Sequence, residues 1–240
     1  MKENTPNSNK QKIDKSLFII SLGGSLINPG QIDEAFLKEF QKLIYAKIKK
    51  GARFALITGG GRPARDYIKA LKAINPKTQA DNLDWMGIYT TRLNAQLVRL
   101  IFGQLAHPLI VEDPNKKVNF TEKVLVAGGW MPGRSTDDDA IRLAKIYSAT
   151  TVINLSNIDY VYTKDPRKFQ DAKKIESISW KDFRKIVGSK WDPGKNLPFD
   201  PTAAKLAEKL KLKVIIANGK DLVNLKSILD GKKFIGTVIN

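Results

Sequence analysis

Three glycine clusters occur in the 240-residue sequence, and each directly follows a short apolar run. They are Gly23-Gly24, Gly59-Gly60-Gly61 and Gly128-Gly129. Because glycine has no side chain, backbone amides in such turns can approach an anion closely, and a helix that begins there adds unpaired N–H groups. One glycine pair after a strand is more often only a tight connection. Three clusters in one chain favour a site that binds several phosphate groups.

The third cluster opens the densest group of polar side chains. Residues 124–127 predict a buried strand, 130–136 a loop, and the following residues a helix whose first turn holds Asp137, Asp138 and Asp139. Carboxylates are favourable at a helix N-terminus, and this explains most of the acidic run. It does not explain the loop, where Ser135 and Thr136 join an arginine as donors to an anion.

A second set of polar residues follows the predicted strand 152–155. Ligands of open α/β sheets bind beyond the carboxyl ends of the strands, so these residues should face the same crevice as the 130–136 loop. Asp159 and Asp165 could position Mg²⁺ or bind a ribose, although an Asp-Pro pair also often begins a turn. Tyr162 fits either the core or the wall of a nucleotide site.

Two arginines occupy the first turn of the helix after the triple glycine. Arg62 and Arg65 oppose the helix dipole there, so stability does not explain their position. A guanidinium at this place can form paired hydrogen bonds with a phosphate. We favour a functional role for Arg65, and for Arg62 both interpretations stay open.

Other common kinds of chemistry do not fit the sequence. It contains no GxxxxGK[ST] and no GxGxxG motif, which disfavours a P-loop and a Rossmann dinucleotide site. The single histidine, His107, precedes a proline and is interpreted as structural, and there is no cysteine, so multi-histidine and thiolate metal sites and the familiar catalytic triads are excluded. Chemistry by positioning and charge remains, as in phosphoryl transfer.

The elements that must position these residues alternate along the chain. The pattern predicts strands at 17–22, 53–58, 108–111, 124–127, 152–155, 214–217 and 235–239. Helices are predicted between them, including 83–102, 180–187, a helix through 206–210 that Asp200 caps, and 221–229. This alternation predicts an α/β fold with a mainly parallel sheet covered on both faces, whereas the strand order cannot be read from it.

Composition sets outer limits. A chain of this length with 42% hydrophobic residues can bury a substantial core, and no apolar stretch approaches the roughly 20 residues that cross a bilayer. Residues 1–15 are polar and predict a disordered tail rather than a secretory signal, so we expect a cytoplasmic protein. The formal charge of +17 is spread over both halves, which makes a nucleic-acid partner an unfavoured interpretation.

Six segments together resemble the archaeal-type UMP kinases of the amino acid kinase superfamily. In order they are SLGGSL (21–26), TGGGRPARDYI (58–68), DWMGIYTTRLNAQL (84–97), GGWMPGRSTD (128–137), NLSNIDYVYTKDPRK (154–168) and FDPTAAKLA (199–207). The resemblance runs from about residue 17 to the C-terminus. It implies a three-layer α/β/α sandwich that transfers the γ-phosphate of Mg-ATP to UMP in pyrimidine biosynthesis, as a homohexamer. It also implies an acceptor-binding lobe at 16–125 and an ATP-binding lobe at 126–240.

The resemblance assigns roles to particular residues. The ATP site would comprise Gly24, Ser25, Gly61, Arg65, Ser156, Asn157, Tyr162 and Asp165. The UMP site would comprise Gly60, Asp84, Trp130, Met131, Pro132, Gly133, Arg134, Ser135 and Thr136. Many superfamily members have a lysine where this chain has Ser21, so another cation must offset the charge of the transferring group. Arg65, Mg²⁺ and Lys164 are the hypotheses, with Asp159 as a further Mg²⁺ contact.

Other interpretations within this fold stay open. Molybdenum or tungsten storage proteins resemble UMP kinases and sequester an oxyanion. Isopentenyl phosphate kinase and acetylglutamate kinase use other acceptors, and the former typically relies on a histidine near its acceptor. The least specific alternative is a basic nucleic-acid binder.

Overall fold

The computed structural model describes residues 17–189 and 197–240. The predicted tail, 1–15, and most of the loop predicted at 188–198 lie outside the described residues. The strands are β1 (Leu17–Leu22), β2 (Arg53–Thr58), β3 (Val124–Ala127), β4 (Thr151–Ser156), β5 (Val161–Tyr162), β6 (Lys174–Ile175), β7 (Ser177–Ile178), β8 (Lys213–Asn218) and β9 (Thr237–Ile239). The helices are α1 (Gly24–Ile27), α2 (Glu34–Ile48), α3 (Gly61–Ile74), α4 (Ala80–Phe102), the short η1 (Gly103–Leu105), α5 (Thr136–Ile146), α6 (Trp180–Val187), α7 (Pro201–Lys209) and α8 (Leu222–Leu229).

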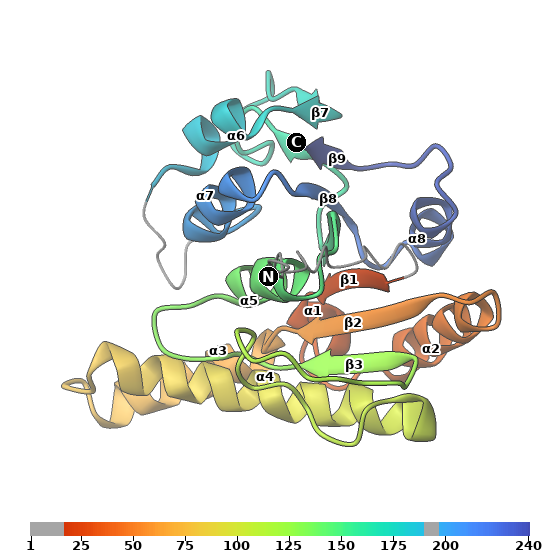
Figure 1. The fold of residues 1–240 in the computed structure, drawn as a ribbon. Helices are drawn as coiled ribbons and strands as arrows, with labels where there is room; N and C mark the ends of the chain where they lie inside the picture. Colours follow the sequence, from red (N-terminus) through yellow and green to blue (C-terminus); the bar gives the residue numbers. More distant parts are fainter. Residues whose placement is uncertain (1–16, 190–196) are drawn as a thin grey trace, which may run out of the picture.

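Seven strands form one sheet in the order β3-β2-β1-β4-β8-β9-β7 (Figure 1). The first five are mutually parallel, β9 runs antiparallel to β8, and β7 runs parallel to β9. The prediction of a mainly parallel sheet is therefore confirmed, and the structure adds the strand order. Because five neighbouring strands share one direction, their carboxyl ends all lie at the same edge of the sheet.

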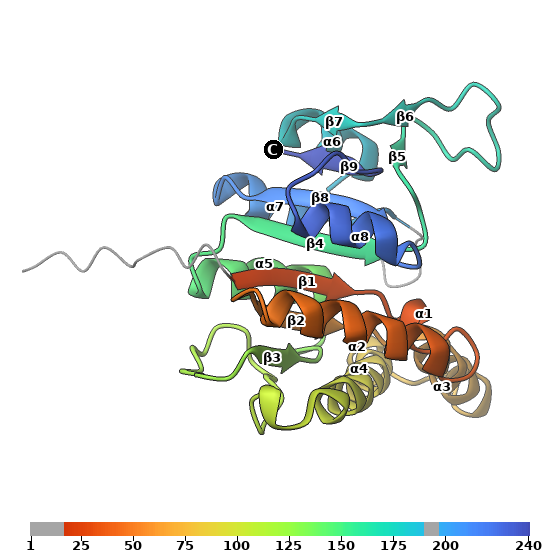
Figure 2. The same ribbon diagram turned by 90° about the vertical axis from the view of Figure 1, so that its right-hand side faces the viewer.

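Helices cover both faces, as predicted (Figures 1 and 2). One apolar cluster lies between the sheet and α5, α6 and α7, and a second lies between the sheet and α1, α2, α4 and α8. Alternate residues of β1 serve the two sides, with Ile19 in the first cluster and Ile20 in the second. The continuous apolar runs of the central strands follow from this burial on two faces.

Local sequence signals account for several helix boundaries. Asp200 caps α7 by accepting from the backbone N–H groups of Thr202 and Ala203, and Pro201 takes the first helical position, where its missing N–H costs nothing. Ser135 caps α5, because its side-chain hydroxyl oxygen accepts from the backbone N–H of Asp138. The helices predicted at 180–187 and 221–229 are confirmed, the second with Asp221 as its cap.

The strand predicted at 108–111 was wrong. Only two isolated bridges, Ala106 to Val124 and Val111 to Ala127, connect this segment to β3. Pro108 cannot donate a hydrogen bond within the segment, and the His107 ring bonds the backbone of Leu109 to make a turn. The last strand is also shorter than 235–239, and the helix predicted from 83 begins three residues earlier.

The turns after β1 and β2 touch each other backbone to backbone. A Cβ atom on Gly24 would overlap the backbone nitrogen of Gly61 and lie 2.5 Å from the carbonyl carbon of Gly59. Gly61 also has φ +71°, a conformation that side chains disfavour. Glycine is thus required here by space and by backbone conformation.

We predict that Gly24→Ala lowers the free energy of unfolding by about 1–3 kcal/mol, because the added methyl group must separate two backbones. Gly30→Ala is the matched control, because a Cβ atom there meets nothing within 4 Å. It should change stability by no more than about 0.5 kcal/mol. Urea denaturation of both variants measures the difference. Equal stabilities would show that the two turns can move apart without cost.

Candidate active site

The first two glycine turns place two helix N-termini side by side at the carboxyl edge of the sheet. Helix α1 begins at Gly24 and α3 begins at Gly61, directly after their strands. Asn94 of α4 is 4% exposed, and its amide donates to the carbonyl oxygens of Gly59 (2.8 Å) and Gly60 (3.3 Å). Helix α4 thus holds the backbone of the second glycine turn in place through the carbonyl groups of Gly59 and Gly60.

Thr91 connects the third glycine turn, at Gly128-Gly129, with the end of β2, from which the second glycine turn begins. The hydroxyl group of Thr91 in α4 accepts from the N–H of Gly129 at 2.6 Å, and its carbonyl oxygen accepts from the hydroxyl of Thr58 at 2.9 Å. Since β2 and β3 are parallel neighbours, both turns lie at the same edge. All three glycine clusters therefore converge there.

The 130–136 loop is held at four points, and one of them is Asp84. Its Oδ2 accepts from the backbone N–H of Gly133 at 2.8 Å, so the structure brings Asp84 and this loop together. Arg92 donates to the carbonyl oxygens of Gly129 and Trp130, both at 3.1 Å. Arg142 lies over the Trp130 ring, 5.1 Å from its centre. Asp139 provides the fourth contact, by accepting from the N–H of Trp130 at 3.2 Å.

Sequence reasoning missed Arg92. It lies within the segment 84–97 that carries the resemblance, but an arginine in the middle of an amphipathic helix gives no sign that it faces a loop 37 residues away. Its side chain is only 16% exposed and also pairs with Glu112 at 2.7 Å. The sequence thus showed an arginine at position 92 but did not show which way its side chain points.

The helix dipole is an insufficient explanation for the three aspartates at the start of α5. Asp138 and Asp139 are each 1% exposed, and Asp138 pairs with Arg142 at 2.6 Å. The Asp137 carboxylate points to the sheet, where Oδ1 accepts from the Asn154 amide at 2.8 Å and Oδ2 from the backbone N–H of Asp200 at 3.1 Å. A polar Asn154 inside an apolar strand was the available sequence signal.

Two of these carboxyl groups hold protons more tightly than usual. Burial, followed by the nearby charge of Asp200, raises the pKa of Asp137 to about 7, against stabilising hydrogen bonds that include one from Ser21. Burial, followed by the charge of Asp138, raises the pKa of Asp139 well above its ordinary value. Carboxyl groups are thus crowded at the N-terminus of α5, and burial favours the protonated form of two of them.

The residues after β4 divide into two groups. Ser156 ends the strand, Asn157 is exposed beside it, and Asp159 accepts from the amide of Asn218 at 2.9 Å. The others lie along the excursion around β5 and β6 that projects from the body of the molecule (Figure 2). Tyr162 is in β5 and partly buried.

The charged residues of this excursion pair with near neighbours. Lys164 forms an ion pair with Asp171 at 2.6 Å, and Asp165 binds Arg167 at 3.0 Å. That bond lowers the pKa of Asp165. On α3, Arg62 pairs with Asp66 at 2.8 Å, whereas no ion pair involves Arg65 among the described residues. Arg65 is exposed.

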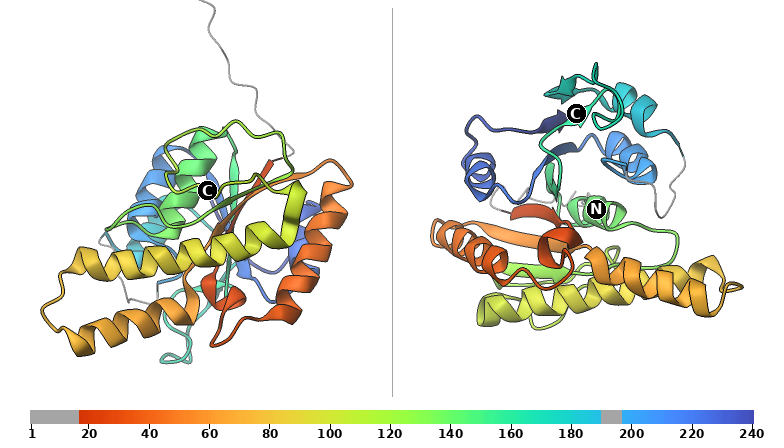
Figure 3. Two further views of the ribbon diagram at one scale, coloured as in Figure 1. Left: turned by 90° about the horizontal axis from the view of Figure 1, so that it is seen from below. Right: turned by 180° about the vertical axis from the view of Figure 1, so that it is seen from behind.

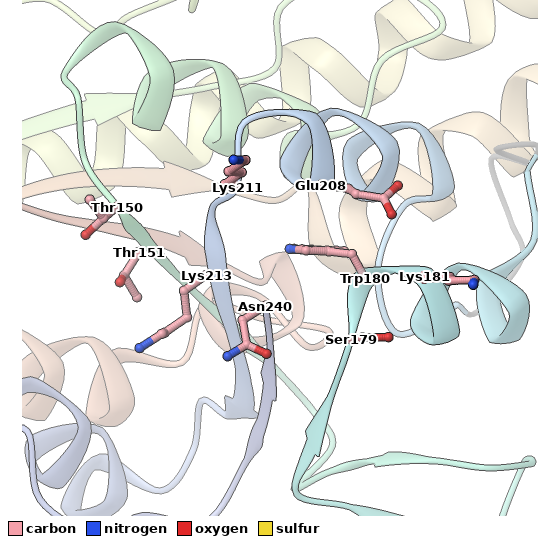
Figure 4. Close-up of a pocket in the computed structure, with 9 residues that line it drawn as sticks. All are labelled: Thr150, Thr151, Ser179, Trp180, Lys181, Glu208, Lys211, Lys213 and Asn240. Atoms are coloured by element: carbon pink, nitrogen blue, oxygen red, sulfur yellow. The ribbon is translucent and has the colours of Figure 1, made fainter.

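A separate cavity of about 540 Å³ lies at the opposite edge of the sheet (Figure 4). It is lined at the starts of β4 and β8 by Thr151 and Lys213, and by Trp180 at the start of α6. None of the residues that we predicted for nucleotide binding lines it. Its position at the amino ends of the parallel strands separates it from the glycine turns.

Among the described residues, no helix is both long enough and apolar enough to cross a membrane. The long helix α4 carries polar and charged residues along its length and packs against α3 and the sheet.

Comparison with known proteins agrees with this architecture. The sequence profile of the amino acid kinase family matches residues 16–218. A uridylate kinase of Thermoplasma volcanium is 37% identical over 225 residues, which cover 92% of this chain and 96% of the relative. One from Sulfolobus acidocaldarius is 36% identical over 208 residues, covering 85% and 90%. The crystal structure of uridylate kinase from Archaeoglobus fulgidus superposes with a TM-score of 0.79 at 31% identity, covering 94% of this chain and all of that one. The shared fold and the matched sequence together show that this chain belongs to the amino acid kinase family.

Proposed function

We propose that the protein transfers the γ-phosphate of ATP to UMP, giving ADP and UDP. The observation that carries this proposal is the convergence of three glycine turns at one edge of the sheet, with the braced 130–136 loop beside them. Two polyanions must meet in line for this reaction, and backbone amides and helix N-termini offset their repulsion. The relatives named uridylate kinase support the choice of acceptor.

The ATP phosphates are assigned to the first two turns. Gly24, Ser25 and Gly61 stand at the N-termini of α1 and α3, where unpaired N–H groups are available, and Arg65 adds a cation one turn along α3. The remainder of ATP is assigned to Ser156, Asn157, Tyr162 and Asp165, which follow β4, next to β1 in the sheet. In this assignment the 126–240 lobe binds ATP.

UMP is assigned to Gly60, Asp84 and the 130–136 loop. One oxygen of Asp84 is bound by Gly133, and we assign the other, Oδ1, which accepts no hydrogen bond within residues 17–189 and 197–240, to a ribose hydroxyl. In the loop, Arg134 is exposed and Ser135 is the N-cap of α5. A guanidinium and a helix N-terminus together suit the α-phosphate of UMP. The 16–125 lobe, together with this loop, then binds the acceptor.

The sole histidine argues against isopentenyl phosphate as the acceptor. The His107 backbone donates to Val124 at the start of β3, so the ring lies toward the amino edge of the sheet, away from the glycine turns. A cytoplasmic location, a role in pyrimidine biosynthesis and the use of Mg²⁺ with ATP complete the proposal.

We also propose that copies of the chain associate into a hexamer through α3 and α4. These two helices pack side by side on one surface of the molecule (Figure 3). Their outer side exposes Tyr67 and Ile74 of α3 and Tyr89, Leu93 and Leu100 of α4. The α4 residues recur at intervals of four and seven and so share one side of the helix. Exposed apolar side chains on two neighbouring helices suit a protein interface.

An assay of ADP release with different acceptors tests the function. Purified protein is given ATP and either UMP, CMP, dUMP or isopentenyl phosphate. We expect the highest kcat/KM with UMP, because the relatives named uridylate kinase support this acceptor, and a lower value with dUMP, because we assign Asp84 to a ribose hydroxyl. Equal use of CMP would indicate a different pyrimidine nucleotide kinase, and preference for isopentenyl phosphate would overturn the proposal.

Arg65→Gln should lower kcat/KM for UMP phosphorylation by about 10²-fold, since a cation beside the phosphates is lost. Arg62→Gln is the matched control, because that arginine pairs with Asp66 on the surface. It should retain activity within about threefold. A comparable loss in both variants would show that Arg65 has no special role.

Leu93→Asp should reduce the mass in solution from that of six chains to a smaller species, as measured by light scattering after size exclusion. A carboxylate in an apolar contact costs several kcal/mol unless it is paired. Val223→Asp on α8 is the control, since Val223 is 78% exposed, as Leu93 is 71% exposed, but lies on another surface. Retention of the hexamer in Leu93→Asp would place the interface elsewhere.

A further inference from the structure

Asn94 is a buried polar residue in the second half of helix α4. Its neighbours Ala95 and Val98 belong to the apolar cluster between this helix and the sheet. Asparagine is a weaker helix former than leucine, and a buried amide lowers stability unless it is hydrogen-bonded. Among the described residues, the Asn94 side chain bonds only the second glycine turn, where Nδ2 donates to the carbonyl oxygens of Gly59 and Gly60. The reason for an asparagine at this position therefore lies in that turn.

These two hydrogen bonds fix the orientation of two peptide groups. The peptide bonds of the turn are trans. In a trans peptide group, the C=O and the N–H of the next residue point in opposite directions. Since the carbonyl groups of Gly59 and Gly60 face α4, the N–H groups of Gly60 and Gly61 point away from α4. Rotation of either peptide group would break its bond to Asn94 and turn its N–H toward the helix.

The same two N–H groups are those that the fold leaves without a partner. On one side of them, the N–H of Gly59 donates to the last residue of β1 at 2.9 Å. On the other side, the N–H of Arg62 donates to the C-cap residue of α1 at 3.1 Å. In the described part of the chain, the N–H groups of Gly60 and Gly61 donate to nothing. Backbone donors without a protein partner are available to a ligand.

We infer that Asn94 is a positioning residue for phosphoryl transfer, because by holding two carbonyl groups it aims one N–H at each substrate. The inference rests on the proposed function, in which Gly60 contacts UMP and Gly61 contacts the ATP phosphates. Donors that are fixed in advance toward developing charge lower the barrier, since they need not reorient during the reaction. Asn94 itself is assigned to neither nucleotide, yet it aligns the donor and the acceptor together.

Steady-state kinetics of Asn94→Leu test this role, because leucine has a similar shape but cannot donate to the two carbonyl groups. We expect kcat/KM to fall by about 10²-fold, as when an aligned donor is lost from an anion site. The KM values of ATP and UMP should rise together, since an N–H assigned to each is released. Circular dichroism measures the folded fraction, because a purely structural role would reduce the amount of folded enzyme and leave both KM values unchanged.

Thr90→Val is the matched control on the same helix. Thr90 is also buried, and its hydroxyl donates to the carbonyl oxygen of Met86 within α4 rather than to the glycine turn. This variant should keep the kcat and both KM values of the unaltered chain.

The pH dependence of Asn94→Asp provides a readout that a purely structural role would not change. An ionised carboxylate only accepts hydrogen bonds, whereas a protonated carboxyl group has one O–H to donate to the turn. Burial beside carbonyl oxygens should raise the pKa of the introduced carboxyl, so its protonated form should accumulate as the pH falls from about 8 to 6. The kcat/KM of Asn94→Asp relative to the unaltered chain should therefore recover several-fold over this range. For Asn94→Leu the same ratio should stay low and constant.

Asn94→Leu with the kcat and KM values of the unaltered chain would overturn the inference. A change in the KM of one substrate only, or a ratio for Asn94→Asp that does not vary with pH, would overturn it as well. These measurements use whichever acceptor the assay of ADP release identifies. The expected losses with an acceptor other than UMP would therefore support the positioning role and refute only the proposed function.

Discussion

Direct backbone contact between the turns after β1 and β2 is the constraint on which the rest of the site depends. Gly24 and Gly61 lie too close for any side chain between them, so the N-termini of α1 and α3 open next to each other. A parallel pair of strands makes this arrangement available, because both strands end at the same edge. The parallel strands thus bring both turns to the same edge of the sheet, and the lack of side chains at Gly24 and Gly61 lets their backbones touch.

Helix α4 extends this arrangement to the third turn. On its inner side, Thr91, Arg92 and Asn94 bind backbone groups of the second and third glycine turns and of the 130–136 loop. On its outer side, Tyr89 and Leu93 are exposed. One helix therefore positions the 130–136 loop, to which we assign UMP, and also carries the proposed interface, so association of the chains would act on the helix that holds this loop.

The charges at the carboxyl edge of the sheet, rather than the net charge of the protein, decide what phosphoryl transfer requires there. The excess of +17 is distributed over the surface, whereas the edge with the glycine turns holds Asp84, Asp137 and Asp200. Backbone amides can bind phosphates without adding full charges, but they cannot neutralise these carboxylates. An enzyme that brings two polyanions together at such an edge needs cations as well, and Arg65 and Mg²⁺ are the cations that we propose.

The sequence by itself determined the alternation of the main strands and helices, the cap at Asp200, and the three glycine turns, because these depend on local periodicity and on backbone conformations that only certain residues adopt. The predicted strand at 108–111 failed because pairing depends on a neighbour that an apolar run does not reveal. Strand order, the direction of Arg92, and the meeting of Asp137 with Asp200, 63 residues apart, were decided only by the tertiary structure. Contacts of that kind depend on how distant elements pack, and residue type alone does not say where a side chain points.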